Sequence, residues 1–375
     1  MRLKQFVLTP LRWLDALLSD HVGPVRILFV VSNRIGLAHQ MPLIQALAAL
    51  PGMRVAVAVD HRAPIGHDAV VRQLEGVSVQ FVAAGWAAWR KWHFVFFTEM
   101  MRLHLRRWAT LFLLHHGPCW GNFDCAQTYG DDVKFGEYSD YLIFKHDAAL
   151  SQATSHDALA AFYRRNPALK ESSQHRSIVM GVPKLDHYRA PPLHERNSRL
   201  AALGLDPDRP TVLITSHWSD KGVLPALGFD VIETLLSHPL RLNIVILGHE
   251  LIWRRGEDGR DARAARLRQQ IESAARERPH VHFDPASIDN AGYLGLADLF
   301  LCDKSSIFVE CLLFDKPILL FKHPDFRFSD AKVGEAYISA SSVFSQPYDI
   351  KDLVDTALQQ PLAQASRRQQ SLDFL

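Results

Sequence analysis

The segment from Asp303 to Phe321 has the residues best suited to binding a nucleotide, because a predicted strand, two serines and a predicted helix follow one another there. Ser305 and Ser306 are expected to begin the helix and to cap it with their hydroxyl groups. The free N–H groups and positive dipole of a helix start favour a phosphate. Glu310 follows four to five residues later, where its carboxylate would accept hydrogen bonds from two ribose hydroxyls. We predict that Asp303, Ser305, Ser306 and Glu310 bind a nucleotide; the alternative is a plain capped helix with Glu310 exposed.

Histidines stand at the ends of two further predicted strands. His115, His116 and Gly117 follow one apolar run, and His249 follows another. Ligands of open α/β sheets gather at the carboxyl edge of the strands. Because the pKa of histidine lies near neutral pH, His116 is a candidate general base for an acceptor hydroxyl. His249 is a candidate donor to a phosphate oxygen. The alternative for each position is a structural or surface histidine.

A third patch, Thr-Ser-His-Trp-Ser-Asp-Lys-Gly at 215–222, follows the first strand of the second half of the chain. Small hydroxyl residues, glycine and lysine in such a turn are suited to a diphosphate. Ser216 and Lys221 are therefore predicted to contact the donor, and the alternative is an ordinary solvated loop.

Several catalytic motifs are absent from the sequence. It has no G-x-x-x-x-G-K-[ST] and no G-x-G-x-x-G after the first strand, which disfavours a P-loop kinase or ATPase and a dinucleotide oxidoreductase. It also lacks H-E-x-x-H, a motif of zinc metalloproteases, and G-x-S-x-G, the nucleophile motif of α/β-hydrolases. No D-x-D motif stands at a strand end, and Asp131-Asp132 falls in a predicted loop, so no metal or other cofactor is predicted.

Alternating strands and helices must position these residues, and the alternation predicts two doubly wound parallel sheets. Expected strands are 26–32, 54–60, 78–82, 110–114, 141–144, 177–180, 211–216, 243–248, 281–283, 299–302 and 317–321. Expected helices are 39–50 after a turn at 33–36, 67–75, 261–277 and a last one near 350–358. The fold class is thus α/β, with two Rossmann-like domains and a cleft between them, which is the GT-B arrangement.

The expected domain organisation follows from the same pattern. An amphipathic segment at 1–24 precedes a Rossmann-like acceptor domain at 25–186, and a proline-rich linker at 187–210 leads to a Rossmann-like donor-nucleotide domain at 211–375. The C-terminal tail is expected to dock back on the first domain.

Bulk composition narrows the class of protein. A chain of 375 residues with 48% hydrophobic and 22% charged residues suits two packed domains. A net charge of +2 gives no case for nucleic-acid binding. The four cysteines (Cys119, Cys125, Cys302 and Cys311) form no C-x-x-C pair, which indicates free buried thiols in a reducing compartment. No secretory signal and no apolar run of about 18 residues is visible, so a cytoplasmic location is expected.

Two segments suggest contact with the inner face of the plasma membrane. The first 20 residues combine helically spaced leucines with basic residues and Trp13, a pattern that suits a membrane interface or a surface helix packed on the domain. The stretch 85–108 holds Trp86, Trp89, Trp92 and Trp108 among basic residues. Two interpretations of this stretch remain open: an interfacial or acceptor-binding surface, and core aromatic residues with a solvated basic face.

Four of these patches together resemble the CDP-glycerol glycerophosphotransferase family, which includes the teichoic-acid primases and polymerases and related capsule polymerases. D-K-S-S-I-F-V-E with the later K-P-I at 303–318 is similar to the family's D-Y-S-S element, and H-G at 116–117 is similar to its W-H-G-T element. G-V-P-K-L-D at 181–186 looks like G-x-P-R-x-D, and G-H-E at 248–250 stands where the family has R-x-H-P.

The resemblance implies roles for individual residues. His116 would be the catalytic base, and His249 would contact the donor phosphates. His115, Gly117, Lys184 and Asp186 would lie near the cleft. Arginines of two family elements are missing, and Lys304 replaces the tyrosine of D-Y-S-S.

The implied activity is transfer of a polyol-phosphate or glycosyl group from a CDP- or UDP-linked donor to a lipid-linked or polysaccharide acceptor. Two alternatives remain open at this point: a nucleotide-sugar epimerase on the same fold, and a catalytically degenerate GT-B scaffold.

Overall fold

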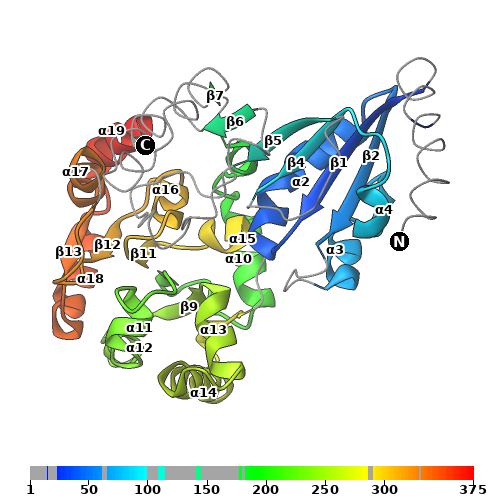
Figure 1. Ribbon diagram of the computed structural model, residues 1–375. Helices are drawn as coiled ribbons and strands as arrows, with labels where there is room; N and C mark the ends of the chain where they lie inside the picture. Colours follow the sequence, from blue (N-terminus) through cyan, green and yellow to red (C-terminus); the bar gives the residue numbers. More distant parts are fainter. Residues whose placement is uncertain are drawn as a thin grey trace. The chain divides into compact units, whose positions relative to one another are not determined.

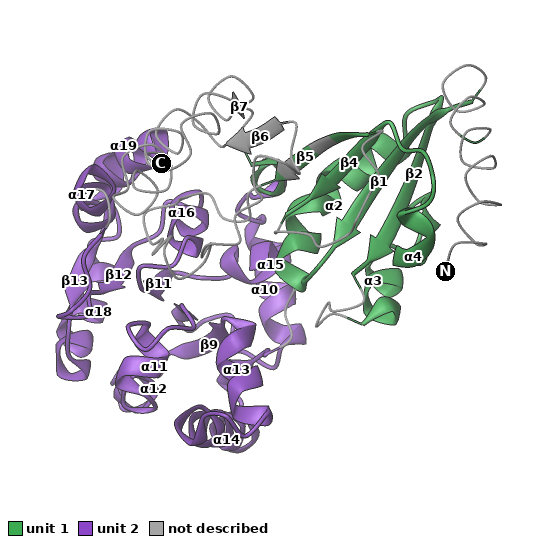
Figure 2. Cartoon of the chain, viewed as in Figure 1, with its two compact units in different colours: residues 1–116, 125–150, 157–186 green, residues 117–124, 151–156, 187–375 purple. Residues whose placement is uncertain are grey.

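The computed structural model describes residue 15 and residues 23–60, 66–98, 109–114, 141–144, 177–179, 182–285, 290–328 and 331–375. These residues form two compact units: the described residues up to Asp186 belong to the first unit, and those from His187 to Leu375 belong to the second (Figure 2). Each unit has its own sheet (Figure 1). None of the helices within the described ranges is long and apolar enough to cross a membrane.

The sheet of the first unit is parallel throughout and has the strand order β3-β2-β1-β4-β5-β6-β7. Its strands are β1 (Val25–Val31), β2 (Met53–Val59), β3 (Gln80–Phe81), β4 (Phe94–Phe97), β5 (Thr110–Leu114), β6 (Tyr141–Phe144) and β7 (Ser177–Val179). The central strands β1 and β2 are near-continuous apolar runs, as expected where helices cover both faces. The order reverses between β1 and β4, which is the topological switch point of a doubly wound sheet.

Three helices of this unit have described bounds: α2 (Arg34–Ala48), α3 (His67–Gln73) and α4 (Ala84–Ala87). The predicted turn at 33–36 with a helix from His39 was wrong. The side chain of Asn33 accepts a hydrogen bond from the N–H of Gly36 at 2.6 Å, and this N-cap starts the helix at Arg34.

The tryptophan-rich stretch has both a core tryptophan and solvent-exposed tryptophans, the two possibilities that the sequence left open. Trp92 is 3% exposed and donates its Nε1–H to the carbonyl of Ala87 at 2.8 Å, so it is a core residue. Trp86 is 70% exposed and Trp89 is 36% exposed, and both face solvent. Trp108 lies outside the described residues, as does the N-terminal segment apart from Asp15. Strand β4 follows Trp92 and was missed by the prediction, because its four residues sit in an aromatic stretch without turn residues around it.

The second unit also contains a fully parallel sheet, with the order β10-β9-β8-β11-β12-β13. Its strands are β8 (Thr211–Ser216), β9 (Asn243–Gly248), β10 (Val281–Phe283), β11 (Leu299–Cys302), β12 (Ile318–Phe321) and β13 (Ser342–Phe344). Counted along this unit, the order is 3-2-1-4-5-6, that of a Rossmann fold, with its switch point between β8 and β11.

Helices cover both faces of this sheet. One face packs against α10 (Leu193–Ala202), α16 (Ile307–Leu312), α17 (Ala331–Ser339) and α19 (Ala365–Phe374). The other packs against α11 (Val223–Leu227), α12 (Asp230–Leu236), α13 (Glu250–Glu257), α14 (Ala262–Glu277) and α18 (Ile350–Gln359). The short helix α15 (Asn290–Leu294) follows β10. Successive residues of β11 alternate between the two cores, with Leu299 and Leu301 on one side and Phe300 and Cys302 on the other.

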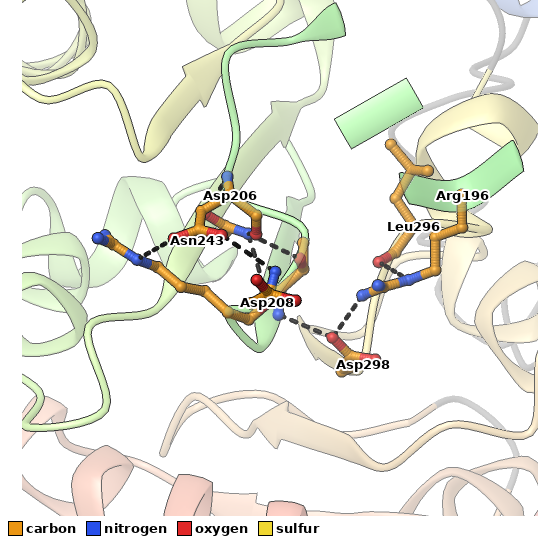
Figure 3. A network of polar contacts seen from close by, with 8 residues as sticks. Arg196, Asp206, Asp208, Asn243, Leu296 and Asp298 are labelled. Carbon is orange, nitrogen blue, oxygen red and sulfur yellow. Dashed lines mark hydrogen bonds and ion pairs between the residues drawn. The ribbon is translucent and has the colours of Figure 1, made fainter. Parts of the chain in front are cut away.

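The expected linker at 187–210 is part of the second unit. Arg196 of α10 donates to Asp298 Oδ2 at 2.6 Å and to the carbonyl of Leu296 at 3.1 Å (Figure 3). The same carboxylate oxygen accepts the N–H of Thr211 at 2.9 Å, at the start of β8. The prolines and charges of this stretch predicted an interdomain connection with a short helix. The helix is α10, and Leu200 and Leu205 are buried in the core of the second unit.

The predicted docking of the C-terminal tail on the first domain was also wrong. Helix α19 packs on α16 and α17 of its own unit. Arg368 is 1% exposed and its Nε donates to Asp315 Oδ1 at 2.8 Å, while the hydroxyl of Ser371 donates to the carbonyl of Ala336 at 2.9 Å. The final Leu375 is 1% exposed, so apolar burial holds the tail against the nearest available core.

Candidate functional site

The candidate site is the carboxyl edge of the second sheet, where chemically active side chains follow four neighbouring strands. His217 comes directly after β8, His249 after β9 and Asp303 after β11, and His323 comes two residues after β12. Since β9, β8, β11 and β12 are consecutive in the sheet, these positions form a row across the switch point.

Asp303 lies at the centre of this row and is completely buried. Its Oδ2 accepts hydrogen bonds from the N–H groups of His217 at 2.9 Å and Val223 at 2.8 Å and from the hydroxyl of Ser216 at 3.2 Å. Its Oδ1 accepts the N–H of Ser305 at 2.9 Å. Burial raises the pKa of this carboxyl, and the hydrogen bonds oppose that shift. The carboxylate therefore ties the loops after β8 and β11 together. The predicted contact of Asp303 with a donor stays a prediction.

Hydrogen bonds fix the two histidines beside this carboxylate in a defined tautomer. Nδ1 of His217 accepts the N–H of Ser219 at 3.0 Å, and Nδ1 of His249 accepts the N–H of Leu251 at 3.1 Å. A neutral imidazole whose Nδ1 accepts has its proton on Nε2. Burial, together with the nearby Lys304 and His249, lowers the pKa of His217 to about 3. Both rings therefore accept through Nδ1 and carry their single proton on Nε2.

Lys304 provides a positive charge next to these donors. It is 9% exposed, and its Nζ lies 4.5 Å from the centroid of the Phe326 ring. Burial lowers the pKa of Lys304, the Asp303 carboxylate raises it, and Lys221 lowers it again. A cation held over an aromatic face beside histidine donors is a suitable arrangement for an anionic ligand.

The start of α16 differs from the prediction. Ser306 is the N-cap residue, but no side-chain cap hydrogen bond is formed, so the predicted capping by serine hydroxyls was wrong. The turn is instead closed by Asp303, whose carboxylate accepts the N–H of Ser305. Ser305 and Ser306 are half-buried. Their hydroxyls are therefore not needed to form the turn.

Glu310 is buried, at 4% exposure, and accepts a hydrogen bond from the hydroxyl of Tyr188 at 2.8 Å. The alternative in which Glu310 is exposed on a plain helix was wrong. Tyr188 comes at the start of the second unit and was not identified from the sequence, since nothing in its local pattern marks a residue that pairs with a carboxylate 122 positions away.

The loop after β8 holds the other two predicted donor contacts. Ser216 is 3% exposed, and its Oγ accepts the N–H of Leu224 at 3.1 Å in addition to contacting Asp303. Lys221 is exposed, and its Nζ donates to the carbonyl of Asp325 at 3.1 Å. Ser216 is thus a buried support of the loop, and Lys221 reaches from this loop to the one that follows β12. Their contacts with a donor stay predictions.

A glycine allows this loop to close. A Cβ on Gly222 would lie 2.1 Å from the carbonyl oxygen of His217 and 3.1 Å from Asp303 Oδ2. The loop after β8 therefore requires a residue without a side chain at this position.

The remaining predicted residues belong to the first unit or lie outside the described residues. Lys184 is buried and Asp186 is exposed in the 3-10 helix Pro183–His187. His115, His116 and Gly117 lie outside the described residues, so their roles stay predictions.

His217 and Lys304, like Tyr188 and His323, were not among the predicted site residues. His217 appeared in the sequence only as part of a polar turn, and Lys304 only as a substitution in a motif. A histidine one residue after a buried strand was the available signal, and it is the same signal that identified His249.

The thiols of the second unit agree with the prediction, since Cys302 and Cys311 are free and buried. Burial raises the pKa of Cys311, which keeps its thiol protonated and unreactive. Cys119 and Cys125 lie outside the described residues. In the part of the chain that the structure describes, no group of three or more His, Cys, Asp or Glu side chains is arranged to hold a metal ion.

Comparison with known proteins shows a fold likeness at low sequence identity. No protein-family profile and no curated protein sequence matches the chain. The solved structure of the wall teichoic acid polymerase TagF is similar over 99% of this chain and 92% of that one, with a TM-score of 0.65 and 14% identity. The Anabaena protein Alr3699/HepE in complex with UDP-glucose is similar over 93% of both chains, with a TM-score of 0.56 and 14% identity. The S. aureus MnaA–UDP structure is similar over 93% of this chain and 90% of that one, with a TM-score of 0.53 and 14% identity. The chain therefore has the GT-B fold of glycosyltransferases, with one parallel Rossmann-like sheet in each unit.

Proposed function

We propose that this protein is a transferase that moves a polyol-phosphate or glycosyl group from a nucleotide-diphosphate donor to an acceptor hydroxyl. The acceptor is a lipid-linked saccharide or growing polymer of cell-envelope polysaccharide or teichoic-acid-like synthesis. One observation carries the proposal: His217, His249 and Lys304 converge on the carboxyl edge of the second sheet at its switch point. Ligands of Rossmann-like domains bind at that place.

The chemistry of these three side chains fits a diphosphate. Two neutral imidazoles that donate through Nε2–H and one ammonium group supply hydrogen bonds and a single positive charge. Without such partners, the free-energy cost of removing an ionised ligand from water would oppose binding in a half-buried site. The structural relatives support a CDP- or UDP-linked donor, since their structures contain CDPG, UDP or UDP-glucose.

In the proposed reaction, His116 takes the proton of the acceptor hydroxyl, and the acceptor oxygen forms a bond to the transferred group. The bond from that group to the nucleotide phosphate breaks. His217 and His249 stabilise the negative charge that develops on the departing phosphate, because their donors are fixed before the reaction begins. Glu310, held by Tyr188, would accept hydrogen bonds from the ribose hydroxyls.

Contact with a lipid-linked acceptor is supported by the exposed tryptophans of the first unit. Trp86 and Trp89 face solvent next to the exposed Arg90. Tryptophan beside a basic residue is typical of a surface that meets lipid headgroups.

The experiment is calorimetric titration of CDP and UDP, followed by product analysis with CDP-glycerol and UDP-sugars in the presence and absence of lipid-linked acceptor. We expect one nucleotide to bind, and we expect His217→Gln and His249→Gln each to weaken binding about 10- to 100-fold, the loss of a hydrogen bond to a charged group. His280→Gln is the matched control, since His280 stands at the opposite, amino-terminal end of a strand. His116→Ala should abolish transfer while leaving nucleotide binding intact. Absence of nucleotide binding would contradict the proposal, and conversion of a UDP-sugar without acceptor would favour an epimerase.

A further inference from the structure

A run of stacked side chains connects helix α13 to His217 of the proposed donor site. The rings of His217 and Trp218 are stacked, with their centroids 5.2 Å apart and their planes at 27°. The guanidinium carbon of Arg255, in the last turn of α13, lies 4.7 Å from the centroid of the Trp218 ring. Arg255 is thus linked to the imidazole of His217 through a shared contact with one indole.

Helix α13 is firmly attached to the sheet close to Arg255. Trp253, two residues earlier, is 1% exposed, and its Nε1–H donates to the carbonyl of Gly248 at 3.1 Å. A Cβ on Gly248 would lie 2.3 Å from Cζ2 of Trp253, so the glycine permits this close packing. The carbonyl of Arg255 accepts the N–H groups of Arg260 at 3.0 Å and Asp261 at 3.1 Å. The backbone that carries Arg255 is therefore anchored before and after this residue.

The contact with Trp218 orients the guanidinium of Arg255. None of the ion pairs among the described residues of the second unit includes Arg255, and the nearby carboxylates of Glu257 and Asp258 pair with other arginines. Arginine stacks well on an indole, because its guanidinium is planar, delocalised and weakly hydrated. The stack in turn restricts the rotation of the Trp218 side chain and of the imidazole that packs on it.

The same helix also fixes the second histidine of the site. His249 is the N-cap residue of α13, and its Nδ1 accepts the N–H of Leu251 at 3.1 Å. The rings of His217 and His249 are 6.4 Å apart, centroid to centroid. Because α13 holds His249 at its first turn and is linked to His217 through Arg255 in its last turn, one helix sets the relative placement of both imidazoles.

We propose that Arg255 is a positioning residue of the donor site, which acts through Trp218 to hold the imidazole of His217 in place for a donor phosphate. The inference rests on the proposed function for the identity of the ligand. Arg255 itself does not contact the donor in this arrangement. Without its guanidinium, Trp218 and His217 would rotate more freely, and nucleotide binding would have to reorder both side chains.

The first test is calorimetric titration of CDP or UDP into the full-length protein and its variants. Arg255→Met should weaken nucleotide binding about 2- to 10-fold, the range expected for the loss of a cation–π contact, and Arg255→Lys should restore part of the affinity. Arg254→Met is the matched control, because it removes the same charge from the same turn of α13, and it should leave the affinity unchanged.

A double variant distinguishes positioning from direct contact with the ligand. If Arg255 acts through His217, Arg255→Met should have no further effect on nucleotide affinity in the His217→Gln protein. NMR spectra without ligand give a second measurement, in which the ring protons of His217 are assigned by their loss in His217→Gln. In the wild type these protons should show the upfield shift that a stacked indole causes, and Arg255→Met and Trp218→Leu should both reduce this shift.

Three results would overturn the inference: equal losses of affinity for Arg254→Met and Arg255→Met, losses that add in the double variant, or unchanged ring-proton shifts of His217 in Arg255→Met. If the wild type binds no nucleotide, the proposed function fails, whereas the ring-proton shifts need no ligand and still test the stack. Thermal unfolding of each variant shows whether it folds, and the rescue by Arg255→Lys separates loss of the stack from general damage to α13.

Discussion

The imidazole rings of His217 and His249 lie 6.4 Å apart, centroid to centroid, at the carboxyl ends of the adjacent strands β8 and β9. Both rings accept a main-chain N–H through Nδ1 from the residue two positions later. The geometry therefore presents two Nε2–H donors at one sheet edge, and it does so with neutral histidines.

Replacement of His217 by Gln is expected to change how stability depends on pH. In the unfolded chain this histidine has its ordinary pKa of 6.5, whereas in the folded protein its pKa is about 3. Between these values the unfolded state binds more protons, so the free energy of unfolding falls as the pH falls, by up to about 1.4 kcal/mol per pH unit. Above pH 6.5 the residue adds no pH dependence. Urea unfolding across this range should show a shallower acid loss for His217→Gln than for the wild type. Equal slopes would mean that His217 is protonated in the folded protein.

Replacement of Gly222 by Ala is expected to damage the site through sterics alone. The added Cβ would lie 2.1 Å from the carbonyl oxygen of His217, so the loop must shift. Such overpacking costs about 1–3 kcal/mol and should also weaken nucleotide binding, since Asp303 loses its fit to the same loop. Gly85→Ala is the control, because a Cβ there meets no atom within 4 Å. A Gly222→Ala protein with unchanged thermal unfolding and nucleotide affinity would contradict the close approach.

Arg196 is expected to contribute far more stability than its neighbour on the same helix. Arg196 is 14% exposed in its ion pair and bonds both Asp298 and the carbonyl of Leu296 (Figure 3). Arg196→Met should lower the free energy of unfolding by about 1–3 kcal/mol, since the half-buried carboxylate of Asp298 loses its charged partner and the carbonyl of Leu296 loses a donor. Arg199 pairs with Glu195 at the solvent-exposed surface, so Arg199→Met should change the free energy of unfolding by no more than about 0.5 kcal/mol. Denaturant unfolding of the two variants makes the comparison, and equal losses would show that the network does not anchor α10.

Removal of the exposed indoles is expected to weaken binding to anionic lipid vesicles. Trp86→Ala and Trp89→Ala together should reduce co-sedimentation with vesicles that contain phosphatidylglycerol, because both side chains face solvent beside Arg90. Leu193→Ala is a suitable control, as this leucine is also 70% exposed but lies in the second unit. Equal vesicle binding by the tryptophan variant and the wild type would remove the support for a membrane contact in this stretch.

The sequence by itself determined the architecture and the strand ends. Buried parallel strands are continuous runs of apolar residues, and such runs at 211–216, 243–248, 281–283 and 299–302 mark the strands of the second sheet within the bounds that the structure gives. Because ligands gather at the carboxyl edge, the same runs also pointed to His249 and to the segment that begins at Asp303. Local patterns were weaker where a single side chain decides the outcome, as at Asn33, whose cap starts α2 earlier than expected.

Only the tertiary structure decided which residues of the candidate site face one another. The bond of Tyr188 to Glu310, the four donors on Asp303 and the contact of Lys304 with Phe326 join positions that are far apart in the chain or belong to different loops. The sequence gives no distance between such positions, because the order of strands in the sheet sets it. Burial is decided in the same way: Asp303 and Ser216 have the residue types of ligand contacts, yet both are buried and hydrogen-bonded to the loop after β8.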